Sequence, residues 1–460
     1  MVGTIAGSIA GASPPVLAAG SDGTAAPASA VPGLAQRHLD PGFWIARHPD
    51  PHALRWTADR VAAHNARLLA LDPSMHDLAR LPAALPGAEV ARRIRALSRR
   101  PAAPRFDGDG AQIDAAALDA LAQALALDAI ADSVPLRWAL VVERAPLRTF
   151  PTRLRAHSAP GDADIDRFQE SAEFPGTPLA VLHDSADGAW SFVLSPRYGA
   201  WVERRFLAEG PRATVLGYAA REPFRVVAGA KPRTVFNPDE PRVSELQLDM
   251  GVRLPVAAPG ADGRIHGQHA QAGHAVQLPL RQADGGLAFA PALLPRQAGV
   301  ADGYLPHTAA NVIAQAFAFL GERYGWGHDY NGRDCSGFVS EVYASMGIAL
   351  PRNTSDQSRS PALDHDAFDA STTPADREAA LARLQVGDLV FVPGHVMLVI
   401  GQLDGAPWVI HDIHGGGVLE ADGSVRRLGL NAVSVTPLLP LAFDDGTRYT
   451  ERMTAIVRLR

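Results

Sequence analysis

The single cysteine of this chain, Cys335, stands where a catalytic nucleophile would stand. It follows a glycine-rich loop and precedes Phe338, Val339 and Val342, whose helical spacing puts it at or next to a helix N-terminus. The unpaired N–H groups and the positive end of the helix dipole stabilise a thiolate there, and they can hold an oxyanion. A structural cysteine more often lies within the apolar stripe of a helix, so the position favours a nucleophile.

A histidine that can carry the proton opens a predicted strand farther along the chain. His395 follows a Pro-Gly turn and begins an apolar run. His411, at the end of the next predicted strand, can accept the ring N–H of His395 and fix its tautomer, as a carboxylate does in serine triads. Asp412 and His414 compete for that place, and spacing alone does not exclude them.

Three other histidines have spacings that would suit a metal. His266, His269 and His274 lie in Gly- and Gln-rich sequence without helical or strand periodicity, which favours a solvated loop over a ligand set. One cysteine excludes an intramolecular disulfide and a multi-thiolate zinc site. We predict no metal and no other cofactor.

The elements expected around Cys335 predict an α+β domain over residues 301–460. A helix is expected from Thr308 to Tyr324, then a glycine-rich turn, then a second helix that begins at the cysteine. Four short apolar runs predict strands at 387–392, 395–400, 408–412 and 453–459. Helices followed by antiparallel strands are an α+β arrangement.

The upstream sequence divides by its periodicity. Residues 38–135 carry apolar side chains at helical spacing and predict a helical N-terminal domain. Short strands with period two, separated by turn residues, predict a small β-barrel over 136–208. A second β-type stretch over 209–300 begins with a sequence that loosely resembles the start of the first. It predicts a second barrel.

Length, charge and the first residues limit the remaining possibilities. At 460 residues the chain exceeds a single core, and its net charge of -6 offers no basic field for nucleic acid. Residues 1–37 resemble a secretion signal that lacks its positive start, and a disordered tail is the alternative. No apolar run is long enough to span a bilayer.

Five segments in the last third of the chain resemble the NlpC/p60 peptidases of bacterial cell walls. They are Tyr324-Gly-Trp-Gly, Arg333-Asp-Cys-Ser-Gly-Phe, Leu350-Pro-Arg-Asn-Thr-Ser-Asp-Gln, Gly387-Asp-Leu-Val-Phe and His395-Val-Met-Leu-Val-Ile-Gly. The resemblance implies a papain-like α+β fold that cleaves peptidoglycan stem peptides, usually between γ-D-glutamate and a diamino acid. It implies Cys335 as nucleophile, His395 as base and His411 as the third polar residue. The hydroxyl of Tyr324 falls where the family assists the oxyanion.

The upstream parts are similar to the subgroup with SH3-like domains and a helical N-terminal domain. Segments that begin at Leu147, Asp166 and Ser195 carry this resemblance. In such enzymes the first SH3 module forms one side of the substrate groove. It restricts the substrates to stem peptides whose L-alanine has a free amine. A tyrosine at the place of Tyr198 touches the substrate there, and a packing role at the barrel rim is the alternative.

The resemblance also implies substrate-binding residues within the catalytic domain, and the sequence departs from the family at two positions. The implied residues are Trp326, Asp334, Ser336, Asn353 and Thr354. Arg333 flanks the nucleophile as well, and for it, as for Asp334 and Ser336, simple loop polarity is an equal alternative. His328 replaces a glycine of many members and is expected to change the groove entry. Asn353 replaces an aspartate that pairs with the substrate amine in some relatives.

The sequence therefore predicts a periplasmic or secreted cysteine peptidase of peptidoglycan stem peptides, with a cytoplasmic location as the alternative. A non-catalytic peptidoglycan-binding protein and a papain-like amidase or acyltransferase are the rival functions. The expected partner is a peptidoglycan or muropeptide substrate, and no nucleic acid or membrane span is expected. The exact bond, the diamino acid and the oligomeric state are not predicted.

Overall fold

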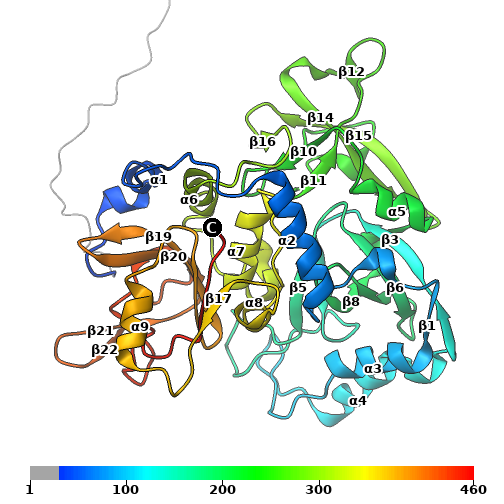
Figure 1. Ribbon diagram of the computed structural model, residues 1–460. Coiled ribbons are helices and arrows are strands. Elements are labelled where there is room, and N and C mark those ends of the chain that lie inside the picture. The colour runs from blue at the N-terminus through cyan, green and yellow to red at the C-terminus, as the bar shows by residue number, and fades with distance from the viewer. Residues whose placement is uncertain (1–30) are drawn as a thin grey trace, which may run out of the picture.

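The computed structural model describes residues 31–460, and Figure 1 shows their arrangement. The expected signal-like segment lies almost entirely outside these residues. Along the described chain, helices come first, two β-rich units follow, and helices with a large sheet close the chain. Within residues 31–460 no helix has the length and apolar character needed to cross a bilayer.

The N-terminal region is helical, as predicted. Its helices are α1 (Pro41–Ile45), α2 (Ala58–Leu71), α3 (Gly87–Leu97) and α4 (Ala115–Ala124). Side chains cap three of them: Asp40 accepts from the N–H of Gly42 in α1, Thr57 from that of Arg60 in α2, and Asp114 from that of Ala117 in α4. Such caps satisfy donors that a helix N-terminus leaves unpaired.

The buried residues of this helical region belong to two different cores. Trp44 and Leu68, from α1 and α2, join the core of the C-terminal domain. Ile94 of α3 and Leu121 of α4 instead pack into the core of the first β unit. The N-terminal helices therefore hold two units together, and α2 runs beside both in Figure 1.

The first β unit is a seven-stranded antiparallel sheet in the order β5-β4-β8-β7-β6-β3-β9. Its strands are β3 (Arg137–Val141), β4 (Ala145–Arg148), β5 (Gln169–Glu173), β6 (Pro178–Asp184), β7 (Trp190–Leu194), β8 (Gly199–Glu203) and β9 (Leu207–Glu209). Alternate side chains face opposite sides of a strand. Phe192 accordingly packs with the N-terminal helices, whereas its neighbour Val193 packs inside the unit.

The second β unit has its own buried cluster, which includes Val227, Leu254, Val276 and Leu294. After helix α5 (Arg212–Tyr218), strands β10 (Phe224–Val227), β11 (Arg253–Pro255) and β16 (Val300–Ala301) form one sheet. A long hairpin, β14 (Gly273–Arg281) with β15 (Leu287–Pro295), forms another.

The histidines of this unit do not share a solvated loop. His269 lies in the exposed two-residue strand β13 (Gln268–His269), whereas His274 is buried in β14, so the prediction of a solvated loop is wrong for His274. Pairing with β15 over nine residue pairs outweighs the weak local signal of this Gly- and Gln-rich sequence. Among residues 31–460 no group of three or more His, Cys, Asp or Glu side chains is arranged to hold a metal ion.

The C-terminal domain places helices before an antiparallel sheet, as predicted. The helices are α6 (Ala309–Phe317), α7 (Cys335–Ala344), α8 (Thr354–Arg359) and α9 (Pro374–Leu381). The six sheet strands, in spatial order, are β17 (His365–Ala367), β25 (Ala455–Val457), β18 (Leu389–Val392), β19 (His395–Leu403), β20 (Ala406–Ile413) and β23 (Ala432–Pro437). Apolar residues of α7, among them Phe338 and Val342, share a core with Val396 and Ile410 of the sheet.

The helix expected to reach Tyr324 is shorter, because α6 ends at Phe317. Gly321 has φ +82°, a left-handed conformation that ends helical geometry. The N–H of Gly321 then donates to the carbonyl of Val433, and that of Tyr324 to the carbonyl of Asn431. Contacts with the sheet edge therefore replace the last helical turns and bring Tyr324 to the cysteine.

Candidate active site

Cys335 is the first residue of α7, at the position that the sequence predicts. Asp334 caps the helix, accepting from the N–H of Gly337 at 2.8 Å. The other early N–H groups have no partner within a helix, so those of Cys335 and Ser336 are available to an oxyanion. The Cys335 Sγ lies 3.6 Å from the Oγ1 of Thr354 and accepts from the backbone N–H of Val396, the residue after His395.

Burial favours the neutral form of the Cys335 thiol. Burial, followed by the charge of Asp334, raises the pKa of Cys335 to about 12, while contacts with Thr354 and Val396 act in the opposite direction. Desolvation of the charged form thus outweighs the contacts that stabilise a thiolate at the helix N-terminus.

His395 and His411 form a hydrogen-bonded pair. The Nε2 of His395 lies 2.7 Å from the Nδ1 of His411, and the Nε2 of His411 lies 3.0 Å from the Oγ1 of Thr436. Strand β19 supplies the first histidine, β20 the second and β23 the threonine. Adjacent strands thus line up three polar side chains in a row.

Thr436 can decide which nitrogen of each ring carries the proton. If His411 donates from Nε2 to Thr436, its Nδ1 must accept, and His395 must donate from Nε2. The Nδ1 of His395 then has a free lone pair and can act as a base. Burial lowers the pKa of His395 to about 4 and lowers the pKa of His411 well below its usual value, so both rings are neutral near pH 7.

The two competitors for the third position do not contact His395. Asp412 is fully buried, and its carboxylate oxygens have no hydrogen-bond partner in the part of the chain that the structure describes. Burial and nearby acidic groups raise the pKa of Asp412 well above its usual value. His414 points instead to the first β unit, where its Nε2 lies 3.3 Å from a carboxylate oxygen of Asp164.

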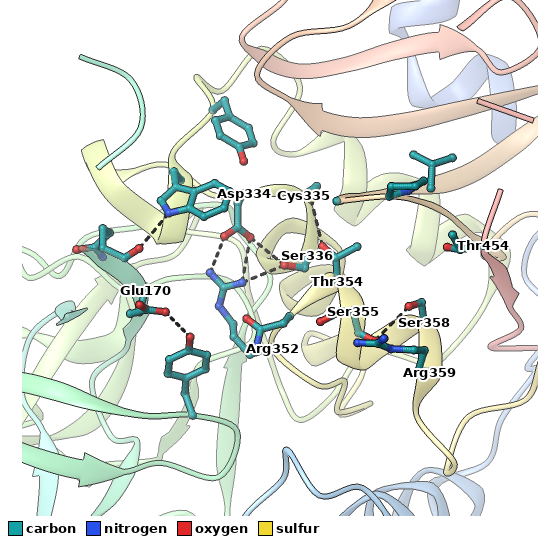
Figure 2. Close-up of a pocket in the computed structure, with 18 of the residues that line it drawn as sticks. Glu170, Asp334, Cys335, Ser336, Arg352, Thr354, Ser355, Ser358, Arg359 and Thr454 are labelled. Atoms are coloured by element: carbon teal, nitrogen blue, oxygen red, sulfur yellow. Dashed lines mark hydrogen bonds and ion pairs between the residues drawn. The ribbon is translucent and has the colours of Figure 1, made fainter. Parts of the chain in front are cut away.

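Cys335 opens into a cavity of about 610 Å³ between the C-terminal domain and the first β unit. Figure 2 shows this cavity with its lining side chains. The predicted site residues that line it are Cys335, Tyr324, Tyr198, Trp326, Asp334, Ser336, Asn353 and Thr354. A cavity of this size suits a small ligand such as a short peptide.

One end of the cavity is acidic, and the first β unit supplies its side chains. The Tyr198 hydroxyl donates to Glu170 at 2.5 Å, and the Thr149 hydroxyl donates to the other carboxylate oxygen of Glu170. Burial and the charge of Glu170 raise the pKa of Tyr198 well above its usual value, so Tyr198 keeps its proton. Trp326 joins this wall through a 3.0 Å bond from its Nε1 to the carbonyl of Gln169.

Sequence reasoning missed Glu170, although it lies within the segment from Asp166 that carries the resemblance to SH3-bearing relatives. The sequence does not indicate that this glutamate faces Cys335, because the facing surface comes from another unit. Arg352 was missed in the same way, within the segment from Leu350. Thr436 had no signal beyond its place in an apolar run.

Arg352 binds Asp334, the residue that caps α7. Its guanidinium donates to both carboxylate oxygens of Asp334, at 3.1 and 2.7 Å, and to the Ser336 hydroxyl at 3.0 Å. It also donates to the Ser171 hydroxyl of the first β unit at 2.6 Å. Burial opposes the charge of Asp334, but Arg352 outweighs it and lowers the pKa of Asp334 to about 2. The cap of α7 is therefore a fixed anion.

His328 does not shape the cavity entrance, and that expectation is wrong. It is 3% exposed and lies between Arg352, 2.8 Å from its Nδ1, and Glu341, 2.9 Å from its Nε2. Burial lowers the pKa of His328 well below its usual value. A neutral ring that accepts from Arg352 and donates to Glu341 satisfies both partners.

Arg333 does not line the cavity either. It is fully buried and forms ion pairs with Glu341, Glu322 and Asp249 at 2.6–3.0 Å. A buried guanidinium needs such partners, which explains why this flanking residue turns inward.

The remaining predicted residues stand at the cavity wall. Tyr324 makes no hydrogen bond through its hydroxyl among the described residues, and burial followed by the Cys335 charge raises its pKa well above the usual value. Its hydroxyl thus stays protonated and can donate. The Nδ2 of Asn353 donates to Asp356 at 2.8 Å, so the neutral residue at this position holds a carboxylate three residues away.

Two segments of the chain match models of known protein families. Residues 321–425 match the model of the NlpC/P60 family, and residues 154–203 match that of an SH3 domain of the SH3b1 type. A dipeptidyl-peptidase 6 of Lysinibacillus sphaericus is 34% identical over 93 residues, which are 20% of this chain and 29% of that protein. A probable endopeptidase p60 of Listeria seeligeri is 39% identical over 98 residues, 20% of this chain and 16% of that protein. The chain thus spans less than a third of the length of these curated relatives.

A solved structure of an NlpC/P60 endopeptidase from Photobacterium damselae subsp. piscicida has a similar fold. Its TM-score is 0.71 at 15% identity, and the match covers 91% of this chain and 96% of that one. This likeness extends the shared fold through the helices and both β units. The chain thus carries an NlpC/P60 domain at residues 321–425 and an SH3b-type domain at residues 154–203.

Proposed function

We propose that this chain is a cysteine peptidase that hydrolyses the γ-D-glutamyl bond to a diamino acid in peptidoglycan stem peptides with a free N-terminal L-alanine. One observation carries the proposal. The thiol of Cys335 lies at a helix N-terminus and contacts the backbone N–H of Val396, directly after His395 of the His395–His411 pair, and it opens into a cavity that Glu170 and Tyr198 also line.

In the first half of the reaction, the Nδ1 of His395 takes the thiol proton while the sulfur attacks the γ-carbonyl carbon. The oxyanion of the tetrahedral intermediate accepts from the N–H of Cys335 and from the Tyr324 hydroxyl. The imidazolium of His395 then protonates the leaving amine, the C–N bond breaks, and a thioester forms on Cys335.

In the second half, His395 removes a proton from a water molecule that attacks the thioester. The same oxyanion donors act again, and the collapse of the intermediate returns the proton to the sulfur. His411 touches no reacting atom and acts as a positioning residue, because it holds the Nε2 of His395.

Specificity for a free amine rests on the acidic end of the cavity. An ammonium group placed beside Glu170 exchanges its hydration for a charge-assisted hydrogen bond. A stem still attached to a sugar has an amide there instead, which carries no charge and needs more room. Some relatives have an aspartate in place of Asn353 that pairs with the substrate amine. In this chain Glu170 of the first β unit supplies the carboxylate instead.

The proposal includes the upstream parts. We place the helical region at 38–135, the first SH3-like unit at 136–208, a second at 209–300 and the catalytic domain at 301–460. The separate core of the second unit supports its being a module of its own. A peptidoglycan substrate favours a periplasmic or secreted location.

Two rival functions lead to different products. A non-catalytic peptidoglycan-binding protein would retain substrate without cleaving it, and a papain-like acyltransferase would pass the acyl group to an amine instead of water. The hydrogen-bonded His395–His411 pair supports catalysis, because Val396, the residue after His395, contacts the thiol. Product identity separates hydrolysis from transfer.

The test compares L-Ala-γ-D-Glu-meso-diaminopimelate with intact sacculi, followed by mass spectrometry of the products. We expect release of L-Ala-γ-D-Glu from the free peptide, little release from sacculi, and no turnover by Cys335→Ala with an unchanged unfolding midpoint. Efficient release from sacculi would refute the requirement for a free L-alanine amine. Turnover by Cys335→Ala would refute the assignment of Cys335 as nucleophile.

A further inference from the structure

The cavity around Cys335 has opposite charges at its two ends. Figure 2 places Glu170 on one side of the cysteine and Arg359 on the other. Both side chains line the same cavity. We propose that Arg359 binds a carboxylate of the leaving group, so that the enzyme selects diamino acids with a free carboxylate. This inference rests on the proposed function, because the acyl side of the peptide occupies the Glu170 end.

Arg359 has most of its hydrogen-bonding capacity free. It is the last residue of α8 and is exposed, and its Nε donates to the carbonyl of Ser355 at 3.2 Å. Within residues 31–460 it takes part in no ion pair, and its two terminal nitrogens have no hydrogen-bond partner. A guanidinium presents these nitrogens as a fork that matches a carboxylate.

Two acidic residues close to Arg359 in the sequence are engaged elsewhere. Asp356 stands three residues before Arg359 on the same helix, a spacing at which opposite charges commonly pair. Its carboxylate instead accepts from the Nδ2 of Asn353 at 2.8 Å. Asp366, on the neighbouring strand β17, pairs with Arg458. Arg359 therefore keeps its charge available to the cavity.

The rest of this end combines hydroxyl groups with apolar side chains. Ser355, Ser358 and Thr454 line it with Ala367 and Phe368. The Ser358 hydroxyl donates to the carbonyl of Ser355 at 3.1 Å, which leaves its oxygen free to accept from a ligand. An ammonium on the diamino acid side chain can donate to these hydroxyls while a carboxylate meets Arg359.

The direction of the substrate follows from the two ends. With the L-alanine amine at Glu170 and the γ-carbonyl at Cys335, the diamino acid extends toward Arg359. Two carboxylates can reach that side: the α-carboxylate of a peptide that ends at the diamino acid, and the second carboxylate of diaminopimelate. A lysine whose α-carboxyl is blocked offers neither.

Four peptides distinguish the α-carboxylate from the side-chain carboxylate of the diamino acid. They are L-Ala-γ-D-Glu followed by meso-diaminopimelate or L-lysine, each with a free α-carboxylate or an α-carboxamide. We expect Arg359→Gln to lower kcat/KM by roughly ten- to a hundredfold on peptides with the recognised carboxylate, and to leave the lysine carboxamide unchanged. A loss on the lysine acid alone identifies the α-carboxylate, and a loss on the diaminopimelate carboxamide identifies the side-chain carboxylate.

Two further variants control for charge. Arg359→Lys keeps the charge without the fork and should lose less than Arg359→Gln. Arg427, an exposed residue of the same domain that pairs with Asp444 and does not line the cavity, serves as the matched control through Arg427→Gln. Equal losses on all four peptides, or an equal effect of Arg427→Gln, would overturn the proposal.

A binding series separates this inference from the proposed function. The same four peptides are titrated calorimetrically into Cys335→Ala with and without Arg359→Gln. If the native enzyme cleaves none of them, hydrolysis is refuted, while carboxylate-dependent binding through Arg359 still supports the inference. If affinity for every peptide is independent of Arg359, the inference fails whether or not the peptides are cleaved.

Discussion

At the scale of single residues, burial favours a neutral thiol at Cys335 and a neutral imidazole at His395. The pKa of Cys335 is raised to about 12 and that of His395 is lowered to about 4, both mainly by burial. Each shift disfavours the charged form of its group. The proton therefore moves to His395 as the sulfur attacks, when the oxyanion donors stabilise the developing charge.

The first prediction concerns pH. His395 accepts a proton only when it is deprotonated, and its lowered pKa moves the acid limb of kcat/KM from the usual 6.5 toward about pH 4. The raised pKa of Cys335 means that ultraviolet titration should show no thiolate absorbance at neutral pH, with Cys335→Ala as the baseline. A thiolate signal at neutral pH that disappears in His395→Ala would contradict this and reveal a resting ion pair.

The sequence identifies the reacting residues because their signals are local. Cys335 precedes an apolar helical stripe, and His395 opens a strand after a Pro-Gly turn. Thr436 and Glu170 gave no such signal, since their importance comes from partners on other strands. Their roles become visible only when the tertiary contacts to His411 and Tyr198 are known.

At the scale of elements, the start of α7 is held by a buried chain of polar contacts. Asp334 caps the helix, Arg352 binds Asp334, and His328 joins Arg352 to Glu341 of the same helix. The chain thus ties the first and second turns of α7 to the loop before it. No helix or strand period predicts it, because its members come from a loop, a helix and the segment before α8.

The second prediction tests how tightly this chain is packed. A Cβ on Gly337 would lie 2.3 Å from the Cε1 of His328, whose ring is fixed between Arg352 and Glu341. Gly337→Ala should therefore destabilise the protein by about 1–3 kcal/mol, and it should lower kcat by moving Cys335. Urea unfolding and kinetics measure the two effects.

Gly217 supplies the matched control. It lies in helix α5, and a Cβ there meets nothing within 4 Å. Gly217→Ala should leave stability unchanged or raise it by about 0.5–1 kcal/mol, because alanine favours the helix. If Gly337→Ala unfolds at the same urea concentration as Gly217→Ala, His328 moves freely and the chain of contacts does not fix the helix.

At the scale of the whole molecule, the active cavity exists only because two units meet. The C-terminal domain provides Cys335 and Arg359, and the first β unit provides Glu170 and Tyr198. The N-terminal helices fix their relative position. In α2 the side chains of His64 and Asn65 bind carbonyls of the C-terminal domain, and the backbone of His76, just after it, binds the first β unit. Periodicity predicted those helices but not their division between two cores.

The last prediction tests whether this shared wall reads the substrate amine. Glu170→Gln keeps the size of the side chain but removes its charge and replaces one of the two oxygens that accept from the Tyr198 and Thr149 hydroxyls with an NH2 donor, so we expect kcat/KM for the free-amine tripeptide to fall at least about tenfold. The N-acetylated tripeptide, a poor substrate, should not lose further. Glu203→Gln, in the same unit but outside the cavity and paired with Arg153 and Arg205, should change neither rate. If Glu170→Gln slows both peptides equally, the β unit supports the cavity without recognising the amine, and the preference for free L-alanine must come from the catalytic domain.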